Sequence, residues 1–297
     1  MKKSRKILYA LCAALMFLTA GCAGVSVHKR ATLRTGMPEE TIQAFESARE
    51  AFEKGQFDKA MILYEGILQH FPSGRVASLS HLRIGEVFIA RGEYSWAIEE
   101  LKLIPDKFAE DPIYAEAGYR LALSYSQLGI IDTSEDICKK LLSGKVSPYL
   151  RPEIESLMGD NLLKSDRDMP AFDWYMKALK SSPNIKLEES VKKKIEGIIA
   201  DSLSPNKLQK IQMDYPKGYP SGYLLYALAK ASFNIRDFEK TNEYLKMFLS
   251  HCKGHPLFED AKAFLRRIAV IKLTNKYALG CVLPLTGKYA TYGNRVL

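Results

Sequence analysis

The sequence predicts an all-α solenoid of stacked helical hairpins, and three observations support this fold class. A small residue recurs every 37 residues, a second small residue lies twelve positions before each of these, and apolar residues follow four and seven positions after them. The recurring small residues are Ala60, Ala97, Ser134 and Ala171, preceded by Ala48, Gly85, Ala122 and Gly159. The apolar followers are Tyr64, Leu101, Cys138 and Tyr175, then Ile67, Ile104, Leu141 and Ala178.

This spacing is typical of two antiparallel helices per repeat. A small residue on each helix lets the two axes approach, and the larger side chains fill the space on either side. Gly55 and Gly92 provide turns between the helices, while Pro72, Pro112, Pro148 and Pro183 fall near the ends of second helices. One hairpin cannot bury its apolar face alone, so the repeats are expected to stack.

The pattern weakens after residue 184 and then recovers. Residues 185 to 219 keep a helical period but lose the small positions, and we interpret this unit as a poor hairpin that bends the solenoid. A regular unit follows, and Leu257 to Leu273 predicts a closing helix. We therefore expect a solenoid over residues 39–275, with five to six hairpins plus the closing helix.

The first residues are typical of a secretory signal. Four cations precede an apolar run of 12 residues from Ile7 to Leu18, which is too short to cross a bilayer. Leu18-Thr-Ala-Gly-Cys22 resembles the lipobox of bacterial lipoproteins, which implies a signal peptide over residues 1–21 and lipidation of Cys22. The alternative is an ordinary signal peptide cut nearby, with Cys22 a free thiol. Ala23 favours an outer-membrane, periplasm-facing anchor, followed by a tether over residues 22–38.

Charge and composition argue against nucleic acid as a partner. The net charge is +9, and removing the four cations of the signal leaves +5, spread thinly over the rest of the chain. The densest cluster, Lys192 to Lys194, is flanked by Glu188, Glu189 and Glu196, as in a solvated helix face. A nucleic-acid surface needs clustered cations in a more basic domain.

No motif indicates an enzyme, a cofactor or a metal. His251, Cys252 and His255 are three potential ligands, but a structural zinc site needs a fourth ligand that nothing nearby provides. Cys138 occupies an apolar position of the repeat and is expected to be a buried packing residue. Gly287-Lys288 lacks the first glycine and the Ser or Thr of a phosphate loop.

The expected function is binding. First helices line the concave groove of a solenoid of helical hairpins, and their polar or exposed residues are candidate contacts for a protein partner. Taken singly, each candidate fits an ordinary solvated helix face equally well. The candidates are Arg49, Leu82, Glu86, Tyr119, Gln127, Asp160 and Lys164.

The repeat resembles the tetratricopeptide repeat, with small, aromatic, Ala, aromatic and Pro residues at the corresponding places. Phe71-Pro-Ser73 and Ile84-Gly85 are similar to the variant found in outer-membrane assembly lipoproteins of the BamD type. Residues Leu279 to Gly293 resemble the first strand and loop of type 1 periplasmic binding proteins. Their sequence is Leu-Gly-Cys-Val-Leu-Pro-Leu-Thr-Gly-Lys-Tyr-Ala-Thr-Tyr-Gly. Residues 276–297 are therefore expected to hold a short orphan β-strand from a truncated second domain.

This order of parts resembles penicillin-binding protein activators of the LpoA type. The resemblance implies a lipid-anchored, non-enzymatic scaffold that binds an envelope partner such as a peptidoglycan synthase. One alternative is an outer-membrane assembly adaptor of the BamD class. Another is the remnant of an amino-acid-type solute-binding receptor.

Overall fold

The computed structural model describes residues 37–105, 111–273 and 288. The expected signal peptide, the lipidation residue Cys22, the tether up to residue 36 and, apart from Lys288, the expected C-terminal strand lie outside these residues. The described residues divide into two compact units, one up to residue 195 and one from residue 196 onward, and each is described by itself.

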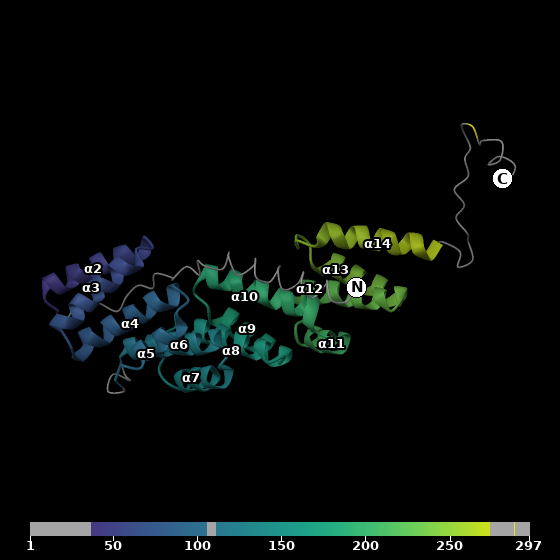
Figure 1. Cartoon of the computed structure of the whole chain (residues 1–297). Coiled ribbons are helices and arrows are strands. Elements are labelled where there is room, and N and C mark those ends of the chain that lie inside the picture. Colours follow the sequence, from purple (N-terminus) through teal and green to yellow (C-terminus); the bar gives the residue numbers. More distant parts are fainter. Residues whose placement is uncertain (1–36, 106–110, 274–287, 289–297) are drawn as a thin grey trace. The chain divides into compact units, whose positions relative to one another are not determined.

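The first unit consists of four helical hairpins followed by one further helix (Figure 1). Each hairpin pairs two consecutive helices, and each pair packs closely along its length. The pairs are α2 (Glu39–Glu53) with α3 (Phe57–His70), α4 (Gly74–Ala90) with α5 (Tyr94–Leu101), α6 (Pro112–Gln127) with α7 (Ile131–Ser143), and α8 (Arg151–Lys164) with α9 (Asp168–Ser181). Helix α10 (Ile185–Gly197) follows.

The second unit begins irregularly and ends regularly. A π-helical turn, η2 (Ile198–Ser202), and a short helix, α11 (Pro205–Asp214), pack on α12 (Ser221–Asn234). Helices α12 and α13 (Phe238–His251) form a hairpin, and α14 (Phe258–Leu273) covers α13. The described residues thus contain five helical hairpins and a closing helix, which confirms the predicted fold class.

The small residues of the repeat lie where the two helices of a hairpin touch. A Cβ atom added to Gly85 would lie 2.8 Å from the side chain of Leu101, and one added to Gly159 would lie 2.5 Å from the ring of Tyr175. In the third hairpin, the Ser134 hydroxyl donates a hydrogen bond of 2.7 Å to the backbone carbonyl of Ala122. The expected role of the spacing, close approach of the two helix axes, is confirmed.

The turns inside the hairpins repeat as regularly as the helices. Residues 55, 92, 129 and 166 are each 37 apart, and all four have positive φ angles between 56° and 78°. Glycine occupies the first three of these positions because it has no Cβ to oppose a left-handed conformation. Asp166 occupies the fourth, so this turn carries a strain that the other three do not.

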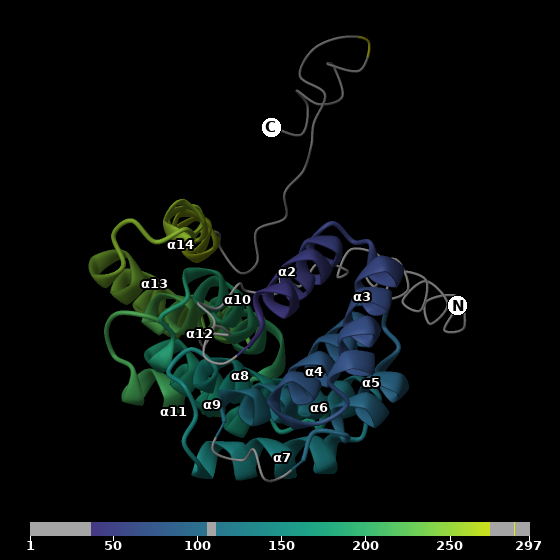
Figure 2. The same ribbon diagram turned by 90° about the vertical axis from the view of Figure 1, so that its left-hand side faces the viewer.

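Among the described residues of the first unit, α6 contributes to two apolar clusters. One cluster runs from Phe45 on α2 to Ala117 on α6, and the other runs from Ala115 on α6 to Met158 on α8. The first helices α4 and α6 are in contact, as are α6 and α8, while α5 and α7 lie outside them (Figure 2). The second unit has its own cluster, centred on Leu245 and Phe248.

The repeat spacing overestimates the length of one helix. In the other hairpins of the first unit, the second helix continues past the apolar residue that lies seven positions after the small one, reaching His70, Ser143 and Ser181. Helix α5 instead ends at Leu101, before its corresponding residue Ile104. Pro105 follows Ile104 directly, and a proline disfavours helical geometry in the residue before it.

No helix among the described residues is both long and apolar enough to cross a membrane.

Candidate functional site

Two of the predicted contact residues on the first helices are buried. Leu82 has no exposed surface and belongs to the core of the first two hairpins. Glu86 is 6% exposed. Neither residue can touch a partner in this structure, so the expectation for these two positions is corrected. The sequence predicted contact at these positions from their place on the first helices, which does not show how deeply a side chain is buried.

Glu86 forms a buried ion-pair network between α4 and α6. Its carboxylate accepts hydrogen bonds from Arg83 at 2.5 Å and from Arg120 at 3.0 Å. Burial opposes ionisation of Glu86, but the two guanidinium groups outweigh burial and hold its pKa below the usual range. Glu116 lies 3.5 Å from Arg83 and 3.9 Å from Arg120 and completes the network.

Three other candidates also join neighbouring elements of the fold. The Asp160 carboxylate accepts a hydrogen bond of 2.6 Å from the hydroxyl of Tyr175 and pairs with Lys194 of α10 at 2.6 Å. The Lys164 ammonium donates to the backbone carbonyl of Ser126 at 2.8 Å. Tyr119 is half-buried, and burial and the nearby Glu153 raise the pKa of its hydroxyl.

These contacts share a separation of about one repeat. Glu86 and Arg120 are 34 residues apart, as are Asp160 and Lys194, and Ser126 and Lys164 are 38 apart. Such pairs join α4 to α6, α6 to α8 and α8 to α10. The polar residues of the first helices therefore have a structural task that the sequence did not reveal.

The remaining two candidates are accessible to solvent. Gln127 is exposed at the end of α6. Arg49 is partly exposed and pairs with Glu46 and Glu53 of its own helix. The structure does not bring either of them near the other candidates as a cluster, and α2 and α6 are separated in the stack by the hairpin of α4 and α5.

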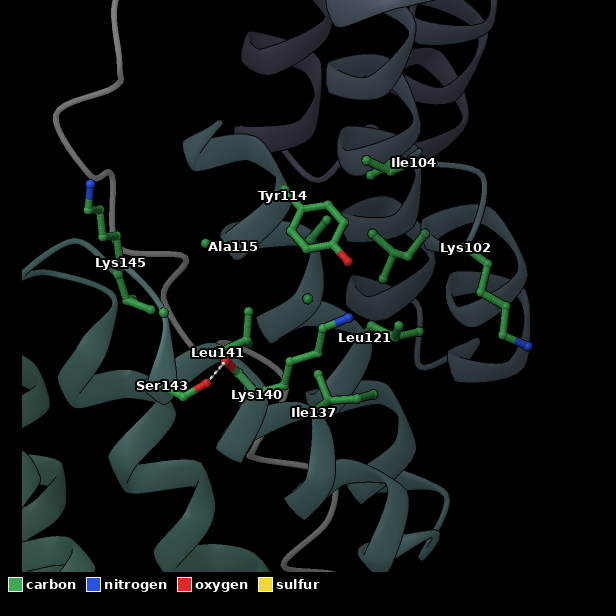
Figure 3. Close-up of a pocket in the computed structure, with 15 residues that line it drawn as sticks. Lys102, Ile104, Tyr114, Ala115, Leu121, Ile137, Lys140, Leu141, Ser143 and Lys145 are labelled. Carbon is green, nitrogen blue, oxygen red and sulfur yellow. Dashed lines mark hydrogen bonds between the residues drawn. The ribbon is translucent and has the colours of Figure 1, made fainter. Parts of the chain in front are cut away.

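The early end of α5 leaves a pocket between α5, α6 and α7. It has a volume of about 740 Å³, within the range of about 300–1,000 Å³ that ligand sites usually have. Leu101 lines the pocket. Ile104 lies on one side, and Leu141 and Ile137 lie on another (Figure 3). The small residues of α6 lie between them. Those small residues are Ala115, Ala117 and Gly118.

The pocket has a basic rim. Lys102, Lys140 and Lys145 line it, and none of its described lining residues is Asp or Glu. In Figure 3, Lys140 extends across the pocket toward Tyr114, while Lys102 and Lys145 lie on opposite sides with their ammonium groups directed outward. Lys102 pairs with Glu99 at 3.1 Å. Within the described residues, Lys140 and Lys145 have no carboxylate partner.

Sequence reasoning missed this pocket, although one signal was present. Pro105 stands where the sister repeats continue their second helix, and a shortened helix leaves unfilled volume beside its neighbours. No pattern in the sequence, however, states which side chains would border that volume.

Of the potential metal ligands near residue 251, His255 packs against aromatic side chains, whereas His251 is exposed. The His255 ring lies edge-on against Tyr223, with centroids 4.4 Å apart, and against Phe248 at 5.1 Å. A Cβ atom on Gly222 would lie 2.6 Å from that ring, so α12 approaches it closely. Burial lowers the pKa of His255. Among the described residues, no group of three or more His, Cys, Asp or Glu side chains could hold a metal ion.

Comparisons with known proteins give structural likeness at low sequence identity. No protein-family model matches this chain, and no curated protein matches its sequence significantly. A tetratricopeptide repeat protein from Parabacteroides merdae aligns over 78% of this chain and 100% of its own, with 13% identity and a TM-score of 0.42. The C-terminal part of a repeat protein from Cytophaga hutchinsonii aligns over 74% and 87%, with 15% identity and a TM-score of 0.44. The MamA protein aligns over 83% and 100%, with 17% identity and a TM-score of 0.40.

The helices, contacts and turns of this chain by themselves show a fold of stacked helical hairpins.

Proposed function

We propose that this chain is a lipid-anchored protein-interaction scaffold at the periplasmic face of the outer membrane, related to activators of peptidoglycan synthases. The observation that carries the binding role is the pocket between α5, α6 and α7. Two of its lysines, Lys140 and Lys145, pair with no carboxylate among the described residues, unlike the polar residues of the first helices, which join one helix to the next.

The chemistry of the described residues supports binding over catalysis. Cys138 has no exposed surface, and burial raises the pKa of its thiol to about 12, which keeps it protonated and unreactive. Glu86, one of the buried carboxylates, is neutralised by two arginines and is closed to a substrate. The perturbed groups thus have explanations in packing and pairing.

The position at the membrane is supported by the first 23 residues of the sequence. The apolar run, the small residues before Cys22 and Ala23 after it together favour a lipid anchor facing the periplasm. We expect palmitate labelling of the full chain in cells and its loss in the Cys22→Ser variant. Labelling that survives Cys22→Ser, or recovery of the unmodified chain in the soluble fraction, would contradict the anchor.

The partner can be identified by placing a photo-crosslinking residue at the pocket. Ser143 is exposed on the rim, and Lys193 on α10 is an exposed control position outside the lining. We expect p-benzoylphenylalanine at residue 143 to crosslink a peptidoglycan synthase in intact cells, and the same residue at position 193 to do so much less. Capture of an outer-membrane assembly component instead would favour the adaptor function.

A further inference from the structure

We infer that the pocket between α5, α6 and α7 binds an extended segment of a partner protein, in which a large apolar side chain is flanked by carboxylates. This inference rests on the proposed scaffold function and adds the chemistry of the segment that is recognised. Three features of the described residues lead to it.

The first feature is an apolar floor with room above it. Leu101, Ile104 and Leu141 form the floor at 3%, 6% and 8% exposure, so they belong to the core as well as to the pocket. Three of the α6 residues that border the pocket, Ala115, Ala117 and Gly118, are small, and they leave space that a large apolar side chain can occupy. Removing such a side chain and this floor from water is favourable.

The second feature is charge. Within the described residues, Lys140 and Lys145 lack a carboxylate partner, and Lys140 extends over the floor (Figure 3). Neighbouring Lys139, in contrast, pairs with Asp136 at 3.2 Å and with Glu135 at 3.7 Å, so its charge is already compensated. A ligand that fits the apolar floor and also carries carboxylates beside it would satisfy both lysines.

The third feature is an extended backbone at the rim. Gly144 has φ −95° and ψ −171°. Residues 145–147 have no regular secondary structure, and a turn over residues 148–150 then leads into α8. Within the described residues, the backbone N–H groups of Lys145 and Val146 make no hydrogen bond. An extended peptide can pair with such groups through its own backbone, whereas an acyl chain cannot. This feature favours a peptide over a lipid.

Selection from a phage-displayed library of random 12-residue peptides tests the inference. The full chain, purified in detergent, is the bait, and the Lys140→Glu/Lys145→Glu variant is the counter-selection bait. The matched control is Lys59→Glu/Lys193→Glu, which makes the same change in net charge at two exposed positions on α3 and α10. Thermal unfolding of each variant shows whether it is folded.

We expect the enriched peptides to combine Asp or Glu with Leu, Ile, Met, Phe or Trp. Their Kd, measured by fluorescence anisotropy, should rise at least tenfold with Lys140→Glu/Lys145→Glu and less than twofold with the control. Ala115→Leu, which adds side-chain volume at the floor, should also weaken binding.

Three results would overturn the inference. The enriched peptides could lack acidic residues, or they could bind the Lys140→Glu/Lys145→Glu variant as tightly as the natural chain. The third result is that the selection enriches no peptide, whereas vesicles containing phosphatidylglycerol bind the chain and this binding depends on Lys140 and Lys145. Crosslinking of a peptidoglycan synthase from another surface would then leave the scaffold function intact while this inference fails.

Discussion

The hairpins α4–α5 and α8–α9 share the same kind of contact between their two helices but differ in the length of the second helix. In each, a glycine of the first helix lies against a large side chain of the second, Gly85 against Leu101 and Gly159 against Tyr175. Helix α9 continues six residues past Tyr175 to Ser181, whereas α5 ends at Leu101 itself. The pocket between α5, α6 and α7 lies beside the shorter of these two second helices.

The two regions also differ in the ion pairs that join one repeat to the next. Glu86 is buried with both of its arginine partners, and the side chains of those arginines are 14% and 16% exposed. Asp160 and Lys194 form an equivalent pair one repeat apart, but each side chain is about one-third exposed, at 34% and 32%. Water screens the pair of Asp160 and Lys194. The same spacing therefore gives a strong interaction at Glu86 and a weak one at Asp160.

The largest expected effect comes from removing the buried charge. Glu86→Gln leaves Arg83 and Arg120 with only the partial compensation of Glu116, and loss of one partner in a buried ion pair costs about 3 to 5 kcal/mol. Asp160→Asn should cost about 1 kcal/mol or less. Urea unfolding of both variants measures the difference, and equal losses would contradict the contrast between the two regions.

Acid should reveal the same network. The pKa of Glu86 is lower in the folded state than in the unfolded state. Its pairing therefore stabilises the fold fully at pH values above the unfolded-state pKa. This stabilisation is lost as the pH falls through the folded-state pKa. The free-energy gap between the natural chain and Glu86→Gln should therefore narrow below about pH 4. A gap that stays constant from pH 7 to pH 3 would mean that Glu86 does not contribute as a carboxylate.

A smaller effect is expected from adding one methyl group at a glycine of the closed α8–α9 hairpin and one at a glycine of α6 beside the pocket. Gly159→Ala places a Cβ atom 2.5 Å from the ring of Tyr175, which is fully buried and held by Asp160. Overpacking of this kind costs about 1 to 3 kcal/mol.

Gly118→Ala should have the opposite sign. Its Cβ atom would lie 3.0 Å from a terminal methyl of Leu141, which borders the pocket and has room to move, and alanine is favoured over glycine in a helix by about 1 kcal/mol. Thermal unfolding should show a lower Tm for Gly159→Ala and an unchanged or higher Tm for Gly118→Ala. A lower Tm in both variants would indicate that the pocket does not give Leu141 room to move away from the added methyl group.

The smallest effect is expected at the turn of the α8–α9 hairpin. Asp166 holds a positive φ of 56° where the three preceding repeats have glycine, so Asp166→Gly should raise stability by about 0.5 to 1 kcal/mol. Gly129→Asp, the reverse change in the α6–α7 turn, should lower stability by a similar amount. The Tm values of the two variants should move in opposite directions.

Much of the fold could be predicted because its determinants are local and periodic. The small residues every 37 positions and the glycines between the helices identify each hairpin from the chain alone. The candidate contacts were predicted less well. Charged residues such as Glu86 were interpreted as accessible, since a sequence does not show that Arg120, 34 residues away, turns a charge into a buried pair.

The sequence by itself determined that this chain pairs and stacks helices, because close approach of two helices requires small residues at a fixed spacing and tight turns require glycine. Only the tertiary structure decided which polar residues hold the stack together and where a pocket opens. A shortened helix can be inferred from Pro105, but the volume that it leaves belongs to three helices at once. The shape and charge of that volume exist only after α5, α6 and α7 have packed.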